Sequence, residues 1–290
     1  MIEEIVELGF DKIELSHGMT VAKLPGIIKA WERGLFRCCG IHNFFPSPVE
    51  VIIDAPDAFE FTSHRSHERK RAMDMTLRSL EMCEQFEAGY LVLHMGCVPM
   101  NPVKWTRALT AMLGEGRHRD AAFLERKQAF VKKREKIASL YYQRAIEALE
   151  QLVERADALG VKLAIESRSR YEDMPSEREM VALQKHFADQ TAIGYWHDFG
   201  HVQLKHNLGL LDHQQWLESI SSHLVGCHLH DVQWPARDHR VPFQGSIDYA
   251  PLLEHIPPEL PLVWELSPTR KAEDIRSALK IWRERHPSHA

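Results

Sequence analysis

Five short apolar runs along the chain each end in an acidic residue or a histidine. The residues that end these runs are His94, Glu166, Asp198, His228 and Glu265. Unbroken apolar runs of this kind are typical of strands that are buried on both faces of a parallel sheet. We therefore expect a scaffold that brings the polar ends of several strands together.

Segments with helical periodicity alternate with these runs, and glycine marks the change from helix to strand. Gly9, Gly89 and Gly160 each precede an apolar run. Glycine ends a helix because it adopts the left-handed conformation at little steric cost. The repeated order of helix, glycine, apolar strand and polar loop predicts βα units that build a parallel sheet.

The expected elements follow this alternation along the chain. Helices are predicted over residues 2–8, 20–35, 66–87, 121–158, 177–188, 213–222, 247–256 and 271–284. Strands are predicted over residues 10–15, 36–42, 90–94, 161–166, 193–198, 224–228 and 261–265. The segment 121–158 is either one long helix or two. Residues 97–119 are expected to be irregular because they contain prolines and glycines, and a loop is expected after Asp198.

About seven strands and eight helices fit a (β/α)8 TIM barrel, whose typical length is about 250 residues. We expect an α/β protein in which residues 1–290 form a single barrel domain. An open doubly wound sheet is the alternative, although the chain has neither a G-x-G-x-x-G motif nor a P-loop. Because the sequence opens on a helix, either the barrel lacks its first strand or the chain starts too late.

Composition narrows the class of protein further. With 290 residues and 44% hydrophobic positions, the chain can bury a sizeable core. Its net charge of -5 gives no basic surface, so we expect no nucleic-acid partner. The five cysteines are scattered, and the N-terminus lacks a signal-peptide pattern. No apolar run reaches the roughly 20 residues of a membrane span, so we expect a cytoplasmic protein without a membrane partner.

Four of the residues that end apolar runs carry nitrogen and oxygen donors. These residues are Glu166, Asp198, His228 and Glu265. Such a set suits Mn²⁺, Mg²⁺, Co²⁺ or Zn²⁺ better than a thiolate site would. Each residue alone is better explained as a helix cap or a surface group. Because the strand ends of a barrel converge around its axis, the four together predict one bound divalent metal ion.

Several short motifs carry a resemblance to a known family. They are Glu166 with Arg170-Tyr171-Glu172, Asp198-Phe-Gly-His201, His228-Leu-His-Asp231, Pro242-Phe-Gln-Gly245-Ser-Ile-Asp248 and Trp264-Glu265-Leu-Ser-Pro. In this order they resemble the xylose isomerase-like TIM-barrel superfamily, from Ile2 to about Ile281. That superfamily includes sugar phosphate isomerases and epimerases, inosose dehydratases and the endonuclease IV repair enzymes.

The resemblance is most specific for the ketose 3-epimerases of this superfamily. It implies that one divalent ion is held by Glu166, Asp198, His228 and Glu265. His228 is preferred over His230 because the family pattern is His-x-x-Asp/Glu. The resemblance also implies that Glu166 and Glu265 are catalytic and stand on opposite faces of the substrate. One removes a proton next to the carbonyl, and the other returns one, through an enediolate.

Further residues are implied to bind the substrate. Glu172 matches a substrate-binding acid of the family, and His201 matches a histidine that contacts substrate oxygens. His239 and Arg240 lie in the loop where relatives place a histidine or an arginine against the substrate. For each of these residues, a supporting or surface role is the alternative.

His42 and His94 end two further strands, and three roles remain open for them. They line the substrate pocket, hold a second metal ion, or pack as ordinary core histidines. In endonuclease IV, histidines at two such strand ends help to hold extra zinc ions. The loop sequence Asp238-His239-Arg240 departs from the Asp-x-His pair of that family.

We therefore expect a divalent-metal-dependent isomerase or epimerase that acts on a sugar, sugar phosphate or cyclitol through an enediolate. The alternatives are an endonuclease IV-like zinc phosphodiesterase that acts on abasic DNA, a dehydratase, and a non-catalytic sugar-binding barrel. The expected partner is a small carbohydrate substrate. A missing first strand would expose a sheet edge, which favours a homo-oligomer.

Overall fold

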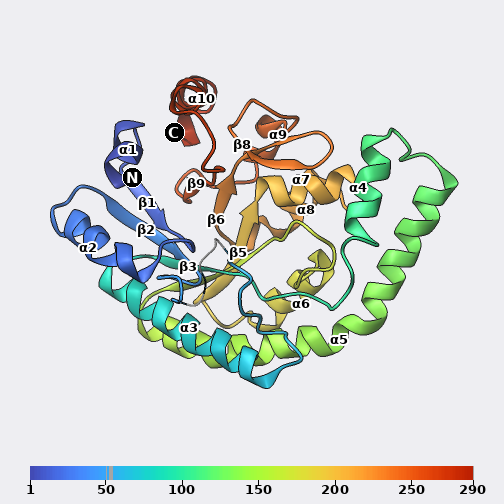
Figure 1. The fold of residues 1–290 in the computed structure, drawn as a ribbon, viewed down its shortest axis with the longest axis horizontal. Coiled ribbons are helices and arrows are strands. Elements are labelled where there is room, and N and C mark those ends of the chain that lie inside the picture. The colour runs from blue at the N-terminus through green and yellow to red at the C-terminus, as the bar shows by residue number, and fades with distance from the viewer. Residues whose placement is uncertain (50, 52–54, 290) are drawn as a thin grey trace.

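A computed structural model of the chain describes residues 1–49, 51 and 55–289. Its main sheet consists of seven parallel strands in the order β1-β2-β3-β4-β5-β6-β9 (Figure 1). These strands are β1 (Lys12–Leu15), β2 (Arg37–His42), β3 (Tyr90–Leu93), β4 (Lys162–Glu166), β5 (Ile193–Asp198), β6 (Leu224–Leu229) and β9 (Leu262–Trp264). Neighbouring strands follow one another along the chain, as expected for repeated βα units.

The seven strands curl into a nearly closed barrel, with β1 and β9 at the two free edges (Figure 1). Side chains approach one another where the sheet stays open. The rings of Phe10 and Trp264 lie 5.5 Å apart, and Glu14 Oε1 of β1 lies 3.1 Å from His228 Nε2 of β6. The predicted α/β TIM barrel is confirmed, and among the described residues it contains seven parallel strands.

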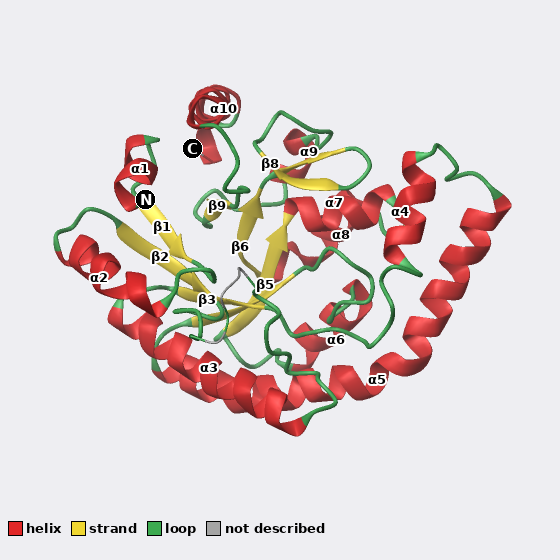
Figure 2. Ribbon diagram, in the orientation of Figure 1, coloured by secondary structure: helices red, strands yellow, loops and turns green. Residues whose placement is uncertain are grey.

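Helices cover the outside of this sheet (Figure 2). They are α1 (Ile2–Glu7), α2 (Leu24–Glu32), α3 (Ser66–Gln85), α4 (Thr106–Gly114), α5 (Ala121–Ala158), α6 (Glu177–His186), α7 (Phe199–Asn207), α8 (His213–Ile220), α9 (Tyr249–Leu253) and α10 (Ala272–Arg285). Short 3-10 helices cover Val21–Lys23, Ser221–His223 and Pro287–His289. The segment 121–158, for which one helix or two was predicted, is the single helix α5.

The structure corrects two predictions of irregular chain. Residues 97–119 contain α4, in which Leu109 and Leu113 are buried against Phe130 of α5. The apolar side of this helix outweighs the nearby prolines and glycines, because it packs on a distant helix. The loop expected after Asp198 is instead α7, whose first turn is capped when Asp198 Oδ1 accepts the His201 amide over 2.6 Å.

A β-hairpin that the sequence pattern did not indicate follows β6. Its strands are β7 (Asp231–Gln233) and β8 (Arg237–Arg240), which pair antiparallel. The two strands are largely polar and lack the alternation that predicts a half-buried strand. The sequence pattern therefore gave no sign of this hairpin, which lies next to the carboxyl end of β6.

The interior of the barrel is filled around Trp196, which is fully buried. Its cluster includes Tyr90, Val92 and Ala164 from neighbouring strands. A side chain on Gly226 could not be accommodated, since its Cβ would lie 2.3 Å from the Trp196 ring. Trp196 also precedes Asp198 by two residues, so both side chains point to the same face of β5. The indole therefore forms the floor beneath Asp198.

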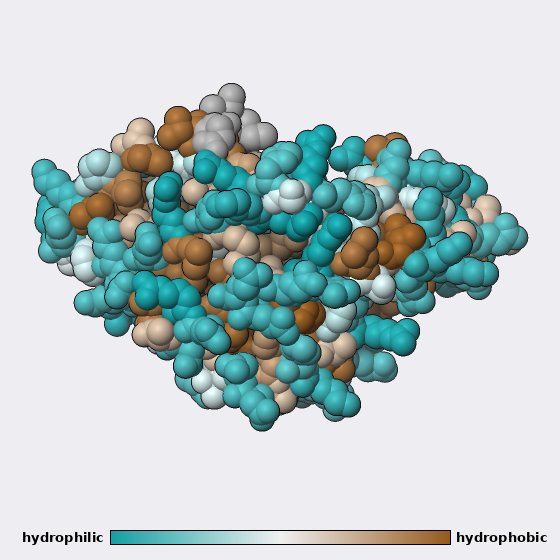
Figure 3. Space-filling model, turned by 90° about the horizontal axis from the view of Figure 1, so that it is seen from below, coloured by the Kyte–Doolittle hydropathy of each residue, from teal (hydrophilic) through white to brown (hydrophobic). Residues whose placement is uncertain are grey.

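None of the helices within the described ranges is long and apolar enough to cross a lipid bilayer. Seen from below, the surface is mostly hydrophilic, and hydrophobic side chains are scattered over it (Figure 3). Isolated exposed apolar residues such as Leu77 and Leu140 are normal for a folded domain.

A chain of buried polar side chains connects β5 to α8. Tyr195 Oη lies 2.9 Å from His197 Nδ1, and His197 Nε2 lies 3.1 Å from His213 Nε2. The Trp216 indole donates to the Tyr195 hydroxyl over 2.8 Å. Gln203 Oε1 of α7 lies 2.9 Å from His213 Nδ1. The network fixes both helices against the outer face of the sheet.

The buried imidazole of His213 predicts a loss of stability in acid. Burial, together with the nearby His206, lowers the pKa of His213 from 6.5 to about 3. The unfolded chain therefore binds more protons than the folded chain once the pH falls below 6.5. The free energy of unfolding should decrease from that pH down to about 3. Between pH 7 and pH 5 we expect His213 to account for about 2 kcal/mol of this decrease.

Urea denaturation at several pH values checks this expectation. The variant His213→Gln should show a pH dependence that is weaker by this amount. The matched control is His118→Gln, which changes an exposed histidine and should follow the wild type. An identical pH dependence in the wild type and in His213→Gln would contradict the assignment.

Candidate metal and substrate site

The four predicted metal ligands meet at the carboxyl ends of the strands. Glu166 ends β4, Asp198 ends β5, His228 lies in β6, and Glu265 follows β9. One ligand atom from each residue lies within 4.8 Å of those from the other three. The sheet register contributes directly, because Asp198 and His228 are paired neighbours on β5 and β6. The barrel therefore brings together residues that are about a hundred positions apart in sequence.

Three of these donor atoms are buried and have no hydrogen-bond partner among the described residues. They are Glu166 Oε1, His228 Nδ1 and Glu265 Oε2. His228 Nδ1 lies 3.6 Å from Glu166 Oε1 and 3.4 Å from Glu265 Oε2. A buried polar atom without a partner is costly, so three that face one another require an explanation. A divalent cation between them would satisfy all three.

His42 and His94 meet at the other carboxylate oxygen of Glu166. His42 Nε2 lies 3.1 Å and His94 Nε2 lies 2.6 Å from Glu166 Oε2. Both histidines are buried. The three side chains form a second group that could hold a metal ion. Glu166 thus separates two clusters, with one carboxylate oxygen directed toward each.

His201, His230 and His239 form a third group of donor atoms on the far side of Asp198. His201 Nδ1 lies 3.1 Å from Glu166 Oε1, and His230 Nε2 lies 3.0 Å from Asp198 Oδ1. The rings of His230 and His239 stack with their centroids 4.2 Å apart. His228 and His230 therefore both approach Asp198, although the sequence motif favoured His228 alone.

Gly200 explains how His230 reaches this position. A Cβ on Gly200 would lie 1.9 Å from the His230 ring, so any side chain there would displace the imidazole. The sequence signal was available, since Gly200 lies inside the Asp198-Phe-Gly-His201 motif. That Gly200 makes room for the His230 imidazole could be recognised only in the folded chain.

Two other site residues were missed by sequence reasoning. Glu14 of β1 accepts a hydrogen bond from His228 Nε2 over 3.1 Å, which directs Nδ1 toward the carboxylates. His17 forms a group of potential ligands with His42 and Glu265. Glu14 ends no apolar run but lies within a short amphipathic strand, so the pattern of run ends did not single it out.

Asp57 and Arg168 support His94 from the side opposite Glu166. Asp57 Oδ1 lies 2.9 Å from His94 Nδ1, and Arg168 donates to Asp57 Oδ2 over 2.7 Å. The Arg168 guanidinium also contacts the His94 ring. A carboxylate that holds the second nitrogen of an imidazole fixes the orientation of the ring. Asp57 thus brings the segment that precedes α3 to the site.

Glu172 and Arg240, which the resemblance implied as substrate-binding, lie outside this cluster. The buried Glu172 carboxylate accepts a hydrogen bond from the Thr106 hydroxyl at the start of α4. Arg240 ends β8, where it is paired across the hairpin with Asp231 and feels the charges of Arg270 and Arg237. By contrast, His239 Nε2 lies 3.5 Å from Glu265 Oε2.

The electrostatics of the cluster keep its carboxylates ionised. Burial by itself would raise the pKa of Glu166, but His94, His201 and other histidines bring it well below the ordinary value. The pKa of Glu265 is likewise lowered, against the effect of burial, by His228 and His239. Ionised oxygen donors beside imidazoles are the ligand set that divalent cations bind. The residues present therefore fit such an ion.

Asp231 holds the backbone of a loop next to the site. Its carboxylate accepts hydrogen bonds from the backbone amides of Val232, Gly245 and Ile247 over 2.7, 2.8 and 3.1 Å. A Cβ on Gly245 would lie 2.3 Å from Asp231 Oδ1, so the loop approaches closely because it carries a glycine there. Asp231 thus ties the segment after β8 to the end of β6.

The comparison with protein families identifies the group to which this architecture belongs. The family model described as xylose isomerase-like TIM barrel matches residues 2–285. The chain belongs to this family. A search among curated proteins finds no match.

Solved structures with a similar fold cover nearly the whole chain. A D-tagatose 3-epimerase-like protein has a TM-score of 0.67 and 15% identity, covering 97% of this chain and 90% of that chain. The 3-keto-D-glucoside 4-epimerase YcjR from E. coli has a TM-score of 0.67 and 16% identity, with coverage of 98% and 92%. The IOLI protein, solved with a bound zinc atom, has a TM-score of 0.65 and 16% identity, with coverage of 98% and 90%. At these identities the likeness shows a shared fold.

The backbone amides held by Asp231 generate a stability prediction. In Asp231→Asn, the side-chain amide would have to face backbone donors, and at least one buried donor would lose its acceptor. We expect the free energy of unfolding to fall by about 1–3 kcal/mol, the cost of one unsatisfied buried donor. Urea denaturation measures the change, with the exposed Asp189→Asn as the control. A loss equal to that of the control would show that the loop is not held in this way.

Proposed function

We propose that this protein is a divalent-metal-dependent isomerase or epimerase of a sugar, sugar phosphate or cyclitol. The observation that carries the proposal is the convergence of three buried donor atoms, from Glu166, His228 and Glu265, that accept or donate no hydrogen bond within the described part of the chain. The similarity in fold to sugar epimerases supports the choice of reaction class. Asp198 completes the ligand set, and one bound Mn²⁺, Mg²⁺, Co²⁺ or Zn²⁺ is the proposed cofactor.

Glu166 and Glu265 are the proposed acid–base pair. Both carboxylates are held ionised, so either is ready to remove a proton from a carbon next to a carbonyl. They come from the ends of different strands, and one oxygen of each approaches His228 Nδ1. The other carboxylate then returns a proton to the enediolate. Proton transfer between two fixed positions changes the configuration or moves the carbonyl.

When bound, the metal ion would act as a Lewis acid that polarises the carbonyl oxygen and stabilises the negative charge that develops there. The surrounding histidines orient the substrate in this proposal. His42, His94 and His201 lie around Glu166, where they can contact substrate hydroxyl groups. His239 is proposed to contact the substrate next to Glu265.

Glu172 and Arg240 lie outside the metal cluster, so the proposal does not assign them a contact with the reacting carbons. Glu172 holds the start of α4, and Arg240 lies on β8 at the edge of the hairpin. Both remain candidates for contacts with parts of a substrate that extend beyond the metal cluster.

The roles of Glu166 and Glu265 generate the first functional prediction. Incubation of the Mn²⁺-loaded protein in D₂O with a panel of ketohexoses and ketoglycosides should introduce deuterium next to the carbonyl, detected by NMR. Glu166→Gln and Glu265→Gln should each slow this exchange by about 10²–10⁴-fold, because each loses a general base. The control Glu218→Gln changes an exposed acid on α8 and should exchange at the wild-type rate. Unchanged exchange in either site variant would remove that residue from the mechanism.

A second candidate function rests on the additional donor groups. His42, His94 and Glu166 could hold a second ion, and His201, His230 and His239 a third. Such a set suits a zinc-dependent phosphodiesterase that acts on abasic DNA. The net charge of -5 disfavours it, because binding to DNA depends mainly on Lys and Arg contacts to phosphates.

Metal content separates the two candidates. We expect about one divalent ion per chain after purification without chelator, as for a single mixed nitrogen and oxygen site. His228→Ala should lose this ion, whereas His94→Ala should keep it. Elemental analysis of the wild type and both variants provides the measurement. Two or three zinc ions per chain, with a loss in His94→Ala and cleavage of abasic duplex DNA, would favour the phosphodiesterase.

A further inference from the structure

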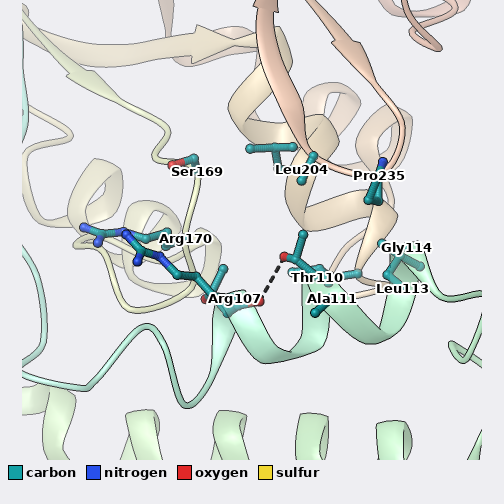
Figure 4. Close-up of a pocket in the computed structure, with 12 residues that line it drawn as sticks. Arg107, Thr110, Ala111, Leu113, Gly114, Ser169, Arg170, Leu204 and Pro235 are labelled. Carbon is teal, nitrogen blue, oxygen red and sulfur yellow. Dashed lines mark hydrogen bonds between the residues drawn. The ribbon is translucent and has the colours of Figure 1, made fainter.

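The structure has a cavity of about 530 Å³ that none of the metal-cluster residues lines. Its walls come from α4, the loop after β4, α7 and the turn between β7 and β8. Figure 4 shows Arg107 and Arg170 on one side of the cavity and Leu204 and Pro235 on the other. The cavity therefore has a cationic side and an apolar side.

The chain path places this cavity next to the proposed reaction centre. Ser169, in its wall, lies three residues after Glu166. Leu204 lies one helical turn after His201 on α7, and residues at this spacing on a helix have their Cβ atoms about 5–6 Å apart. A molecule bound at Glu166 and His201 could therefore extend into the cavity.

The cavity is lined by positive charge, although the protein as a whole has an acidic balance. Arg107 and Arg170 contribute to the lining, and none of the described residues that line it is acidic. Arg170 is already paired with Asp173, whose Oδ1 accepts from Nη2 over 2.6 Å. Arg107 is exposed, and its guanidinium has no hydrogen bond or ion pair with any residue in the described ranges. One guanidinium thus remains available to a ligand.

The position of Arg107 on α4 strengthens this cationic character. Arg107 is the second residue of α4, so the positive end of the helix dipole adds to the charge of its guanidinium. The Thr106 hydroxyl is occupied by Glu172, and this contact fixes the first turn of α4 beside the loop after β4. The guanidinium is therefore carried by a helix end that is held in place.

We propose that this cavity binds an anionic substituent of the substrate, a phosphomonoester or a carboxylate, with Arg107 as its principal partner. The apolar wall at Leu204 and Pro235 packs against the carbon chain that connects the substituent to the reacting carbons. The inference rests on the proposed function, because it assigns the cavity to the substrate of the same site. It narrows the substrate class to acidic sugars.

Isothermal titration calorimetry of the Mn²⁺-loaded protein at low salt tests the proposal without requiring turnover. The probes are D-fructose 6-phosphate with D-fructose, and D-glucuronate with D-glucose, which separate the phosphate from the carboxylate. We expect at least one anionic sugar to bind about tenfold more tightly than its neutral partner, as for a charge-assisted contact. Arg107→Gln should remove most of this preference and leave binding of the neutral sugar unchanged.

Two further variants serve as a control and as a second test of the cavity. Arg78→Gln changes an exposed arginine on α3 and should retain the full preference. Ala111→Trp fills the cavity from an exposed position on α4, so it should block the anionic sugar without disturbing the core. A preference that survives both Arg107→Gln and Ala111→Trp would overturn the proposal.

Inorganic phosphate serves as the remaining probe. Equal affinity for inorganic phosphate and for the sugar phosphate would reveal a site for free anions and would overturn the link to the substrate. If neither anionic sugar binds more tightly than its neutral partner, the cavity proposal fails. The isomerase proposal would then still stand or fall on deuterium exchange with neutral sugars, so the two failures are distinguishable.

Discussion

The site depends on the buried carboxylate of Glu166. One of its oxygens lies within 3.1 Å of both His42 and His94, while the other faces His201 and His228. A buried carboxylate is tolerated only when compensating charge and hydrogen bonds surround it. The surrounding histidines supply this compensation and lower its pKa. The histidines at the strand ends around β4 therefore offset the cost of burying this carboxylate and also keep it ionised.

The incomplete barrel makes the edge strands part of the site. Among the described strands β1 has a backbone partner on one side only, yet Glu14 reaches across to His228 of β6. This contact orients the imidazole and connects the two halves of the open barrel by side chains. Below it, the indole of Trp196 fills the interior and forms a rigid floor. A seven-stranded barrel can thus position its ligands without the closure that an eighth strand would provide.

Segments outside the barrel shape the approach to the cluster. The segment that carries Asp57 holds His94, and the loop after β8 is tied down by Asp231. Helix α4, which is inserted between β3 and β4, contributes Arg107 to the lining of the neighbouring cavity in our proposal. In barrels of this kind the strands carry the chemistry, while the loops that follow them differ in what they bind. The peripheral segments are therefore where the specificity of this chain should be found.

The alternation of helices and strands, the barrel class and the four residues Glu166, Asp198, His228 and Glu265 could be predicted from the amino-acid sequence alone. These follow from periodicity and from polar residues at the ends of apolar runs, which are local properties. The contact of Glu14 with His228, the approach of His230 to Asp198 and the contact of Glu172 with Thr106 became visible only in the folded chain. The physical reason is that these contacts depend on which distant side chains the curved sheet brings within a few ångströms, and short-range patterns contain no such information.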